Sequence, residues 1–209
     1  MTALIASILP VGVRYAEAFD DAVPAPLFPA EERLLTGAKA KRRGEFATAR
    51  RCARDALGEL GIAPAPLLRG PGGAPAWPPG VLGSLTHCAG YRAAVVARCE
   101  RVRVLGIDAE PAIPLPDGVL GLVTSPGERA ALAALAPGVH WDRLLFCAKE
   151  AVYKAWFPIT GTWLGFRDAT VEFDSTGAFR AVVRAPGGPG GFTGRWLAGD
   201  GLLLAAVTA

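Results

Sequence analysis

Helix-forming and strand-forming segments do not alternate regularly along this chain, and this irregular order constrains the fold more than any other feature. Apolar spacing predicts long helices over residues 31–60 and 142–156, with a shorter helix over 125–135. Apolar runs between turn signals predict short strands near residues 3–8, 81–86, 91–98, 102–110, 170–174, 179–184, 192–197 and 202–207. A doubly wound parallel sheet requires regular alternation, so this order disfavours it.

We therefore expect an α+β fold made of two similar halves. Each half would contain a long helix and a short, mostly antiparallel sheet, with the halves joined near residue 105. This interpretation gives an N-terminal half at residues 1–104 and a C-terminal half at residues 105–209. A chain of 209 residues can form either one large domain or two small ones.

Composition excludes several classes of protein. Hydrophobic residues make up 51% and charged residues 20% of the chain, which indicates a folded protein. The formal charge of +3 is small, and no basic run is interleaved with aromatic residues, so we expect no nucleic-acid partner. No run has the length of a membrane span. The apolar residues 1–13 lack a basic beginning and include Pro10, so we interpret them as a buried first strand of a cytoplasmic protein.

The cysteines and histidines do not suggest a zinc site. The four cysteines are Cys52, Cys88, Cys99 and Cys147. None forms a C-x-x-C pair, and their surroundings are apolar, so we expect reduced thiols in the core. Only His87 and His140 could add nitrogen ligands.

Two carboxylates end the apolar strand predicted at residues 102–110. Asp108 and Glu110 lie two residues apart, so both point to the same side of the strand. Adjacent acids repel each other unless a cation or donors compensate. Mg²⁺ takes one or two carboxylates together with substrate phosphates, which fits this pair. An ordinary polar strand end before Pro111 explains the same residues and stays open.

A third acid lies between two of the four lysines of the chain. Glu150 follows Lys149 and is one helical turn before Lys154, so Glu150 and Lys154 share a helix face. A routine surface ion pair is the alternative. His87, at a strand end, is either a structural residue or a phosphate contact.

Taken together, these segments resemble a known family. Its ordered motifs match residues 83–87 (GSLTH), 106–110 (GIDAE) and 146–154 (FCAKEAVYK), with further agreement at 43–50, 75–80 and 163–166. The chain is thereby similar, from about residue 33 to 174, to the 4′-phosphopantetheinyl transferases of the surfactin-activator class. Within that class it most resembles the enterobactin-synthetase component D type, whose fold is two similar α+β halves with the active site between them.

This resemblance implies a reaction. A transferase of this family moves the phosphopantetheine arm of coenzyme A to a serine of an apo acyl or peptidyl carrier protein and releases 3′,5′-ADP. The resemblance assigns Mg²⁺ to Asp108, Glu110 and Glu150. Glu150, directly or through a metal-bound water, would take the serine proton. Lys154 would stabilise the phosphate charge, with Lys149 placed to assist.

The resemblance also implies where coenzyme A binds. Four cationic or titratable residues match the 3′-phosphate positions, namely Arg43, Arg50, Arg69 and His87. Arg42 could take the role of Arg43, because the register there is loose. The loop at residues 70–75 would lie near the adenine, although it departs from the usual Lys-Pro pair.

Several questions stay open. A different Mg²⁺-dependent diphosphate hydrolase and a non-catalytic module that binds coenzyme A or carrier protein are the alternatives, although a hydrolase should carry a denser acidic motif. Glu128 fits both a capping box with Ser125 and an acid near the site.

We expect a monomer, with an apolar strip around residues 115–122 as a carrier docking site. The sequence does not say whether the carrier serves peptide, polyketide, siderophore or fatty-acid synthesis.

Overall fold

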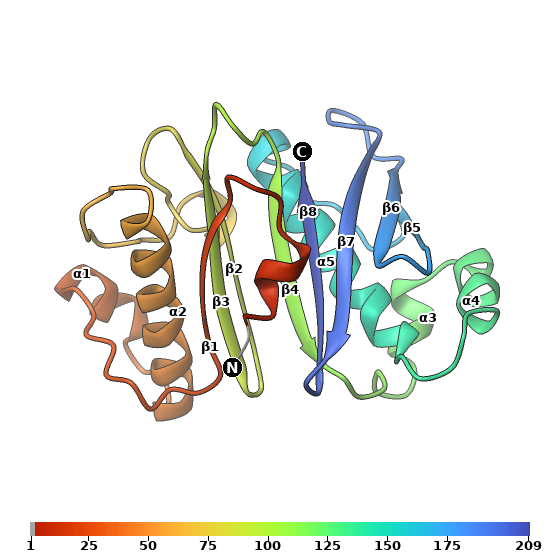
Figure 1. Cartoon of the computed structure of the whole chain (residues 1–209), viewed down its shortest axis with the longest axis horizontal. Coiled ribbons are helices and arrows are strands. Elements are labelled where there is room, and N and C mark those ends of the chain that lie inside the picture. Colours follow the sequence, from red (N-terminus) through yellow and green to blue (C-terminus); the bar gives the residue numbers. More distant parts are fainter. Residues whose placement is uncertain (1–2) are drawn as a thin grey trace.

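The computed structural model describes residues 3–209 and contains two antiparallel sheets with helices packed against them (Figure 1). The predicted α+β class is therefore confirmed. In chain order the elements are η1 (Ile5–Ile8), β1 (Arg14–Ala18), α1 (Pro29–Glu32), η2 (Arg33–Leu35), α2 (Ala40–Gly58), η3 (Pro71–Gly73), β2 (Val81–Cys88), β3 (Tyr91–Arg98), β4 (Leu105–Pro111), α3 (Val119–Val123), α4 (Pro126–Ala133), α5 (Trp141–Thr160), β5 (Ala169–Phe173), β6 (Ala178–Val183), β7 (Gly191–Gly199) and β8 (Leu202–Thr208).

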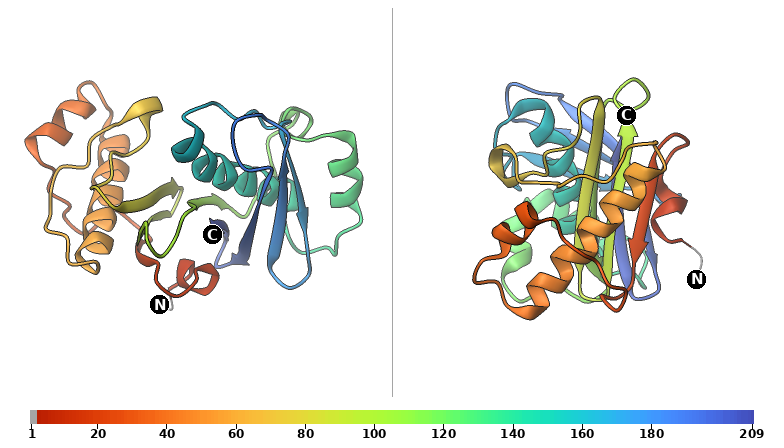
Figure 2. Two further views of the ribbon diagram at one scale, coloured as in Figure 1. Left: turned by 90° about the horizontal axis from the view of Figure 1, so that it is seen from above. Right: turned by 90° about the vertical axis from the view of Figure 1, so that its left-hand side faces the viewer.

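The first sheet has three strands in the order β1-β3-β2, and both pairings are antiparallel. Helix α2 covers its outer face, which is plain when the molecule is viewed from that side (Figure 2). Cys52 and Ala53 of α2 pack on Ala94 of the central strand, and one helical turn later Ala56 packs on Val96. The small residues on this helix face let the helix lie close to the sheet.

The second sheet has five antiparallel strands in the order β4-β8-β7-β6-β5. Helix α5 packs across β4 and β8, and α3 and α4 lie at the far end of the molecule (Figure 1). Alternate residues of β8 divide between two cores. Ala205 and Val207 join the core around α5, whereas Leu204 and Ala206 join the core on the other side, which contains η1. The apolar face predicted for α5 is confirmed, since Leu144, Leu145, Ala148, Ala151, Val152 and Ala155 are all buried.

The two sheets meet where β2 runs beside β4. Side chains, and not a strand ladder, form the polar contacts at this junction. The Ser84 hydroxyl accepts a hydrogen bond from the Ile107 N–H at 3.0 Å, and the Thr86 hydroxyl accepts one from the Ala109 N–H at 3.0 Å. One apolar cluster also includes residues from both sheets, so the two parts share a core.

The first strand was predicted in the wrong place. Residues 5–8 form a 3-10 helix, and the edge strand lies at Arg14–Ala18. Glu17 of that strand accepts hydrogen bonds from the N–H groups of Leu4 and Ile5, which holds the short helix against the sheet. Ile5 and Ile8 are buried as expected, but through a helical turn. Residues 1 and 2 of the apolar segment 1–13 lie outside the described residues.

The long helix predicted over residues 31–60 is broken into α1, η2 and α2. Gly37, with φ of +77°, turns the chain between η2 and α2. The second long helix is longer than predicted and runs through Pro158 to a C-cap at Gly161, where φ is +65°. Pro158 has no N–H group, so the helical hydrogen bond to the carbonyl oxygen of residue 154 is missing at that point.

Two smaller expectations can be compared with the structure. All four cysteines are free; Cys52 and Cys147 are buried as predicted, whereas Cys99 is exposed, so the core assignment was wrong for that residue. Among residues 3–209, no helix combines the length and the apolar character that crossing a bilayer would require.

Candidate active site

Strand β4 directs one set of side chains toward α5. Leu105, Ile107 and Ala109 belong to the core on the opposite side, so the alternation of the strand turns Asp108 and Glu110 toward the helix. This confirms the sequence argument that the two acids share a side. Asp108 is almost fully buried, and Glu110 at the strand end is half-buried.

Gly106 brings this part of β4 unusually close to α5. A Cβ atom at residue 106 would lie 2.2 Å from the Ala151 carbonyl oxygen and 2.6 Å from the Ala155 nitrogen. Only glycine fits this contact, because the obstacles are backbone atoms that cannot move independently. The close approach places the acids of β4 beside the polar residues of α5.

Asp108 lies at the centre of the polar contacts between the two sheets. Its Oδ1 accepts hydrogen bonds from the Lys154 ammonium at 2.7 Å and from the Thr86 hydroxyl at 3.0 Å. Lys154 also donates to the Leu85 carbonyl oxygen at 3.2 Å, so it connects α5 to β2. Asp108 Oδ2 is buried and has no hydrogen-bond partner among residues 3–209. A buried carboxylate oxygen without a partner is costly unless a ligand completes it.

The three predicted metal ligands influence one another electrostatically. Burial raises the pKa of Glu150, and the charge of Asp108 raises it further. Burial and Asp108 also raise the pKa of Glu110, against the opposing effect of Arg143, which donates to Glu110 Oε2 at 2.9 Å. The acids therefore form a region of negative charge that a cation would relieve.

Carboxylate oxygens are the ligands that Mg²⁺ prefers, and the unpaired Oδ2 of Asp108 gives such an ion a position to fill. The residues present therefore fit the group. Within residues 3–209, no three acidic, histidine or cysteine side chains already approach closely enough to form a metal cage. Glu110 in particular is engaged by Arg143. Binding of one ion by all three acids would require their carboxylates to come closer together than they are in this structure.

A cavity of about 510 Å³ lies next to this cluster. It runs between the loop at residues 70–77 and the last turns of α5, where Lys154 borders it. Trp77 forms part of its wall and packs flat on Gly83, where a Cβ atom would lie 2.4 Å from the indole ring. Tyr153 and Phe157 add aromatic surface. These walls suit a planar, largely apolar group.

A second cavity of about 280 Å³ is lined by cationic and titratable side chains, and it shares wall residues with the first. The shared residues are Gly73, Pro75 and Leu85. The cationic and titratable residues are Arg42, Arg50, Arg69 and His87. Three of the four predicted phosphate contacts are thus brought together.

The structure does not bring Arg43 to this cavity. Its guanidinium forms an ion pair with Glu32 of α1 and donates to the Leu35 carbonyl oxygen of η2. Arg42 takes the predicted position. One residue on a helix corresponds to a rotation of about 100°, which explains the exchange.

His87 and its neighbours form a small polar network at the mouth of the second cavity. Burial and the charge of Arg42 lower the pKa of His87. The neutral ring accepts a hydrogen bond at Nε2 from Arg42 at 2.8 Å, and its Nδ1 lies 3.9 Å from Glu45. Glu45 also lies 3.8 Å from Arg42. An anion entering here would meet Arg42 and His87 already held in place.

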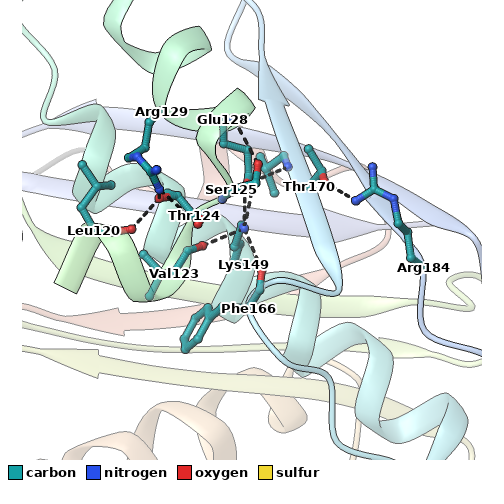
Figure 3. Close-up of polar contacts among 11 residues, drawn as sticks. Leu120, Val123, Thr124, Ser125, Glu128, Arg129, Lys149, Phe166, Thr170 and Arg184 are labelled. Carbon is teal, nitrogen blue, oxygen red and sulfur yellow. Dashed lines mark hydrogen bonds and ion pairs between the residues drawn. The ribbon is translucent and has the colours of Figure 1, made fainter. Parts of the chain in front are cut away.

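Lys149 is not placed at the acidic cluster. Its ammonium is buried and has three acceptors, shown in Figure 3: the Val123 carbonyl oxygen at 2.8 Å, the Phe166 carbonyl oxygen at 2.8 Å, and Glu128. With its donors occupied in this way, Lys149 holds α5 to α3 and to the chain after the helix. This network replaces the role that the resemblance implied for Lys149, direct assistance at the phosphate.

Glu128 completes this network and resolves the two interpretations of that acid. Its side chain accepts hydrogen bonds from the N–H groups of Ser125 and Val171, and Ser125 caps the helix in return. The predicted capping box is therefore confirmed (Figure 3). Glu128 forms its ion pair with Lys149.

Sequence reasoning missed several residues around the site. Thr86 lies within the GSLTH motif, so its position there was the available signal. Arg143 carried no signal, because it is one of many arginines and its contact with Glu110 depends on the packing of α5 against β4.

Comparison with known proteins shows the family of this chain. A family model described as the 4′-phosphopantetheinyl transferase N-terminal domain matches residues 30–97, and the 4′-phosphopantetheinyl transferase superfamily model matches residues 104–201. The chain belongs to the 4′-phosphopantetheinyl transferases.

Curated relatives agree over nearly the full length. The chain is 50% identical to the 4′-phosphopantetheinyl transferase PptT of Mycobacterium tuberculosis, covering 98% of this chain and 97% of that protein. It is 52% identical to the 4′-phosphopantetheinyl transferase Svp of Streptomyces mobaraensis, covering 98% and 88%. Enterobactin synthase component D of Salmonella typhimurium is 34% identical, covering 68% of this chain and 59% of that protein.

Proposed function

We propose that this enzyme transfers the 4′-phosphopantetheine arm of coenzyme A to a serine of an apo acyl or peptidyl carrier protein, depends on Mg²⁺, and releases 3′,5′-ADP. The observation that carries the proposal is the position of Lys154, which pairs with Asp108 and borders an aromatic cavity that shares wall residues with a second cavity lined by arginines. A molecule with a planar base, a phosphomonoester and a diphosphate matches this arrangement from end to end.

The binding of coenzyme A would use both cavities. Trp77, Tyr153 and the loop at residues 70–75 would hold the adenine end, and Arg42, Arg50, Arg69 and His87 would hold the 3′-phosphate. Lys154, which borders the first cavity, would then contact the diphosphate. Mg²⁺ bound by Asp108, Glu110 and Glu150 would supply charge neutralisation on the diphosphate.

The chemical step is a displacement at phosphorus. The carrier serine oxygen forms a bond to the phosphorus that bears the pantetheine arm, and the bond from that phosphorus to the oxygen of 3′,5′-ADP breaks. Glu150 takes the serine proton. Lys154 stabilises the charge that develops on the phosphate oxygens, and its bond to Asp108 holds the ammonium in position.

A carrier domain would dock near α3. Within the strip predicted at residues 115–122, Leu122 is 67% exposed, whereas Leu115 is buried. Ile113, 54% exposed, lies just before the strip. We therefore place the apolar docking residues at Ile113 and Leu122, at the end of the molecule where α5 begins.

One assay tests the function against its alternatives. The protein is incubated with Mg²⁺, coenzyme A and an apo carrier domain, and the carrier is weighed by mass spectrometry. A gain of the phosphopantetheine mass, absent when Mg²⁺ is chelated, is the expected result. Hydrolysis of coenzyme A without this gain would indicate a hydrolase, and binding without turnover would indicate a non-catalytic module.

A further inference from the structure

Glu31 is a fully buried carboxylate outside the acidic cluster. It is 0% exposed, and it belongs to the short helix α1 that precedes α2. Burying a charged carboxylate is costly unless donors and cations surround it. The contacts of Glu31 therefore show which groups stabilise its charge and which segments it connects.

Three groups donate hydrogen bonds to Glu31, one from the N-cap of the same short helix and two from distant parts of the chain. The Phe28 N–H donates to Oε2 at 3.0 Å, which closes α1 locally. Arg54 of α2 donates to both oxygens, at 3.2 and 3.1 Å. The Leu67 N–H donates to Oε1 at 2.9 Å across 36 residues of chain.

Leu67 links Glu31 to the arginines of the second cavity. Its N–H is held by Glu31, and its carbonyl oxygen accepts a hydrogen bond from Arg50 Nε at 2.9 Å. Arg69 lies two residues further on, where the chain bridges to Pro75 on the wall of both cavities. By holding the Leu67 N–H, Glu31 therefore limits the movement of the segment that carries Arg69.

Glu31 also balances the charge of Arg50. Arg50 Nε lies 3.9 Å from Glu31 Oε1, and the guanidinium stacks over the Phe46 ring at 4.2 Å. Burial lowers the pKa of Arg50 to about 10, and Glu31 opposes that effect. Arg50 is thus a buried cation that needs both an orienting acceptor and a counter-charge.

We propose that Glu31 is a positioning residue for the 3′-phosphate of coenzyme A. It acts through Leu67 to set Arg50 and Arg69 across the second cavity, and it does not contact the ligand. This inference rests on the proposed function, because it assumes that the second cavity receives that phosphate.

The test uses two donors that differ only in this phosphate: coenzyme A and 3′-dephospho-coenzyme A. The measured quantity is the ratio of their kcat/KM values for modification of an apo carrier. In Glu31→Gln we expect this ratio to fall roughly tenfold, corresponding to one weakened charge-assisted contact. The loss should be in KM for coenzyme A, with kcat little changed and 3′-dephospho-coenzyme A used as before.

Glu17→Gln is the matched control. Glu17, in β1, is another carboxylate of the N-terminal half that accepts hydrogen bonds from N–H groups distant in sequence, those of Leu4 and Ile5, and it lines neither cavity. It should lower the melting temperature without changing the donor ratio. A Glu31→Gln protein that melts lower but keeps the wild-type ratio would overturn the proposal, because Glu31 would then be structural only.

A second variant covers the case in which Glu31→Gln does not fold. Glu31→Asp keeps the charge but shortens the side chain by one methylene group, so the carboxylate can no longer reach Arg54 and the Leu67 N–H at the same time. The donor ratio should fall again, and a folded Glu31→Asp protein with the wild-type ratio would overturn the proposal. The wild-type protein distinguishes failure of the proposed function from failure of the proposal for Glu31. If the wild type transfers nothing to the carrier, the proposed function is overturned. If it transfers from both donors equally well, the second cavity does not recognise the 3′-phosphate and the role of Glu31 is overturned.

Discussion

At the scale of single residues, the two oxygens of Asp108 differ in a way that indicates how the site works. Oδ1 is saturated by Lys154 and Thr86, whereas Oδ2 is buried without a partner. The protein thus orients the carboxylate with its own donors and leaves one oxygen for a ligand. Lys154, in turn, is held between Asp108 and the Leu85 carbonyl oxygen, so its charge is fixed before substrate arrives.

Replacing Glu150 with glutamine should abolish most of the transfer activity. The amide keeps the shape of the side chain but can neither accept the serine proton nor bind a cation as a carboxylate does. We expect the rate of carrier modification to fall by about 10²–10⁴-fold, with the melting temperature nearly unchanged. Mass spectrometry of the carrier measures the rate. Glu172→Gln, on an exposed position of β5, is the control and should keep full activity.

The sequence predicted the acids of this site better than its cations. Asp108 and Glu110 follow from strand alternation, which depends on local geometry alone. Choosing between Arg42 and Arg43 requires the rotation of α2 about its axis, which is set by packing against β3. Lys149 lies beside Glu150 in the motif, yet its ammonium binds groups up to 26 residues away that no local pattern reveals.

At the scale of elements, the contact between β4 and α5 should tolerate no side chain at residue 106. In Gly106→Ala the new methyl group would meet the Ala151 carbonyl oxygen and separate strand from helix. We expect a loss of about 3 kcal/mol in the free energy of unfolding, together with reduced activity, because the acids and Lys154 would move apart. Urea unfolding measures the first and carrier labelling the second.

Gly127→Ala is the matched control for that substitution. Gly127 lies in α4, and a Cβ atom there would meet nothing within 4 Å. Because alanine favours a helix over glycine, this change should be neutral or stabilising by up to about 1 kcal/mol. Equal losses of stability in both variants would contradict the role assigned to Gly106.

The Lys149–Glu128 pair should contribute stability that acid removes. Burial alone would raise the pKa of Glu128, but the hydrogen bonds from Lys149 and from the Ser125 and Val171 N–H groups lower it below its ordinary value. A carboxyl group with a lowered pKa stabilises the fold above its unfolded-state pKa of about 4.3. This stabilisation is lost as the pH falls below that value and through the folded-state pKa.

Lys149→Met tests the pair, since it keeps the length of the side chain and removes the charge. We expect a loss of about 3–5 kcal/mol in the free energy of unfolding at neutral pH, because Glu128 is left buried without its cation. The difference in the free energy of unfolding between variant and wild type should shrink as the pH falls toward 3. At that pH Glu128 of the variant is protonated, so it no longer carries a buried, unpaired charge. Urea unfolding across this pH range measures it, and a constant difference would contradict the assignment.

Elements were easier to predict than their ends. Every strand from residue 81 onward was found within a few residues, because turn signals and alternation are local. The segment at residues 3–8 was mistaken for a strand because it is short and apolar, and its helical turn is stabilised by Glu17, more than ten residues away. The break at Gly37 was missed because the sequence on both sides suits a helix.

At the scale of the whole molecule, the two sheets depend on each other. Residues of η1, β3, β4 and β8 share one apolar cluster, with Tyr91, Ile107 and Leu204 fully buried in it. Separating the halves would expose this surface to water. Residues 1–104 or 105–209 expressed alone should therefore show no cooperative thermal unfolding by circular dichroism. Co-expression of both fragments should restore it, and a fragment that melts cooperatively alone would contradict this expectation.

The junction between β2 and β4 has a consequence for how such chains can vary. A backbone ladder would commit both strands to one register along their whole length, whereas here the polar contacts are made by the hydroxyls of Ser84 and Thr86. Recombination between related genes near residue 100 would need to preserve those two hydroxyls, the contact of Lys154 with the Leu85 carbonyl oxygen, and the facing apolar residues. Residues 105–209 could in this way be exchanged for the matching part of a related chain while residues 1–104 are kept.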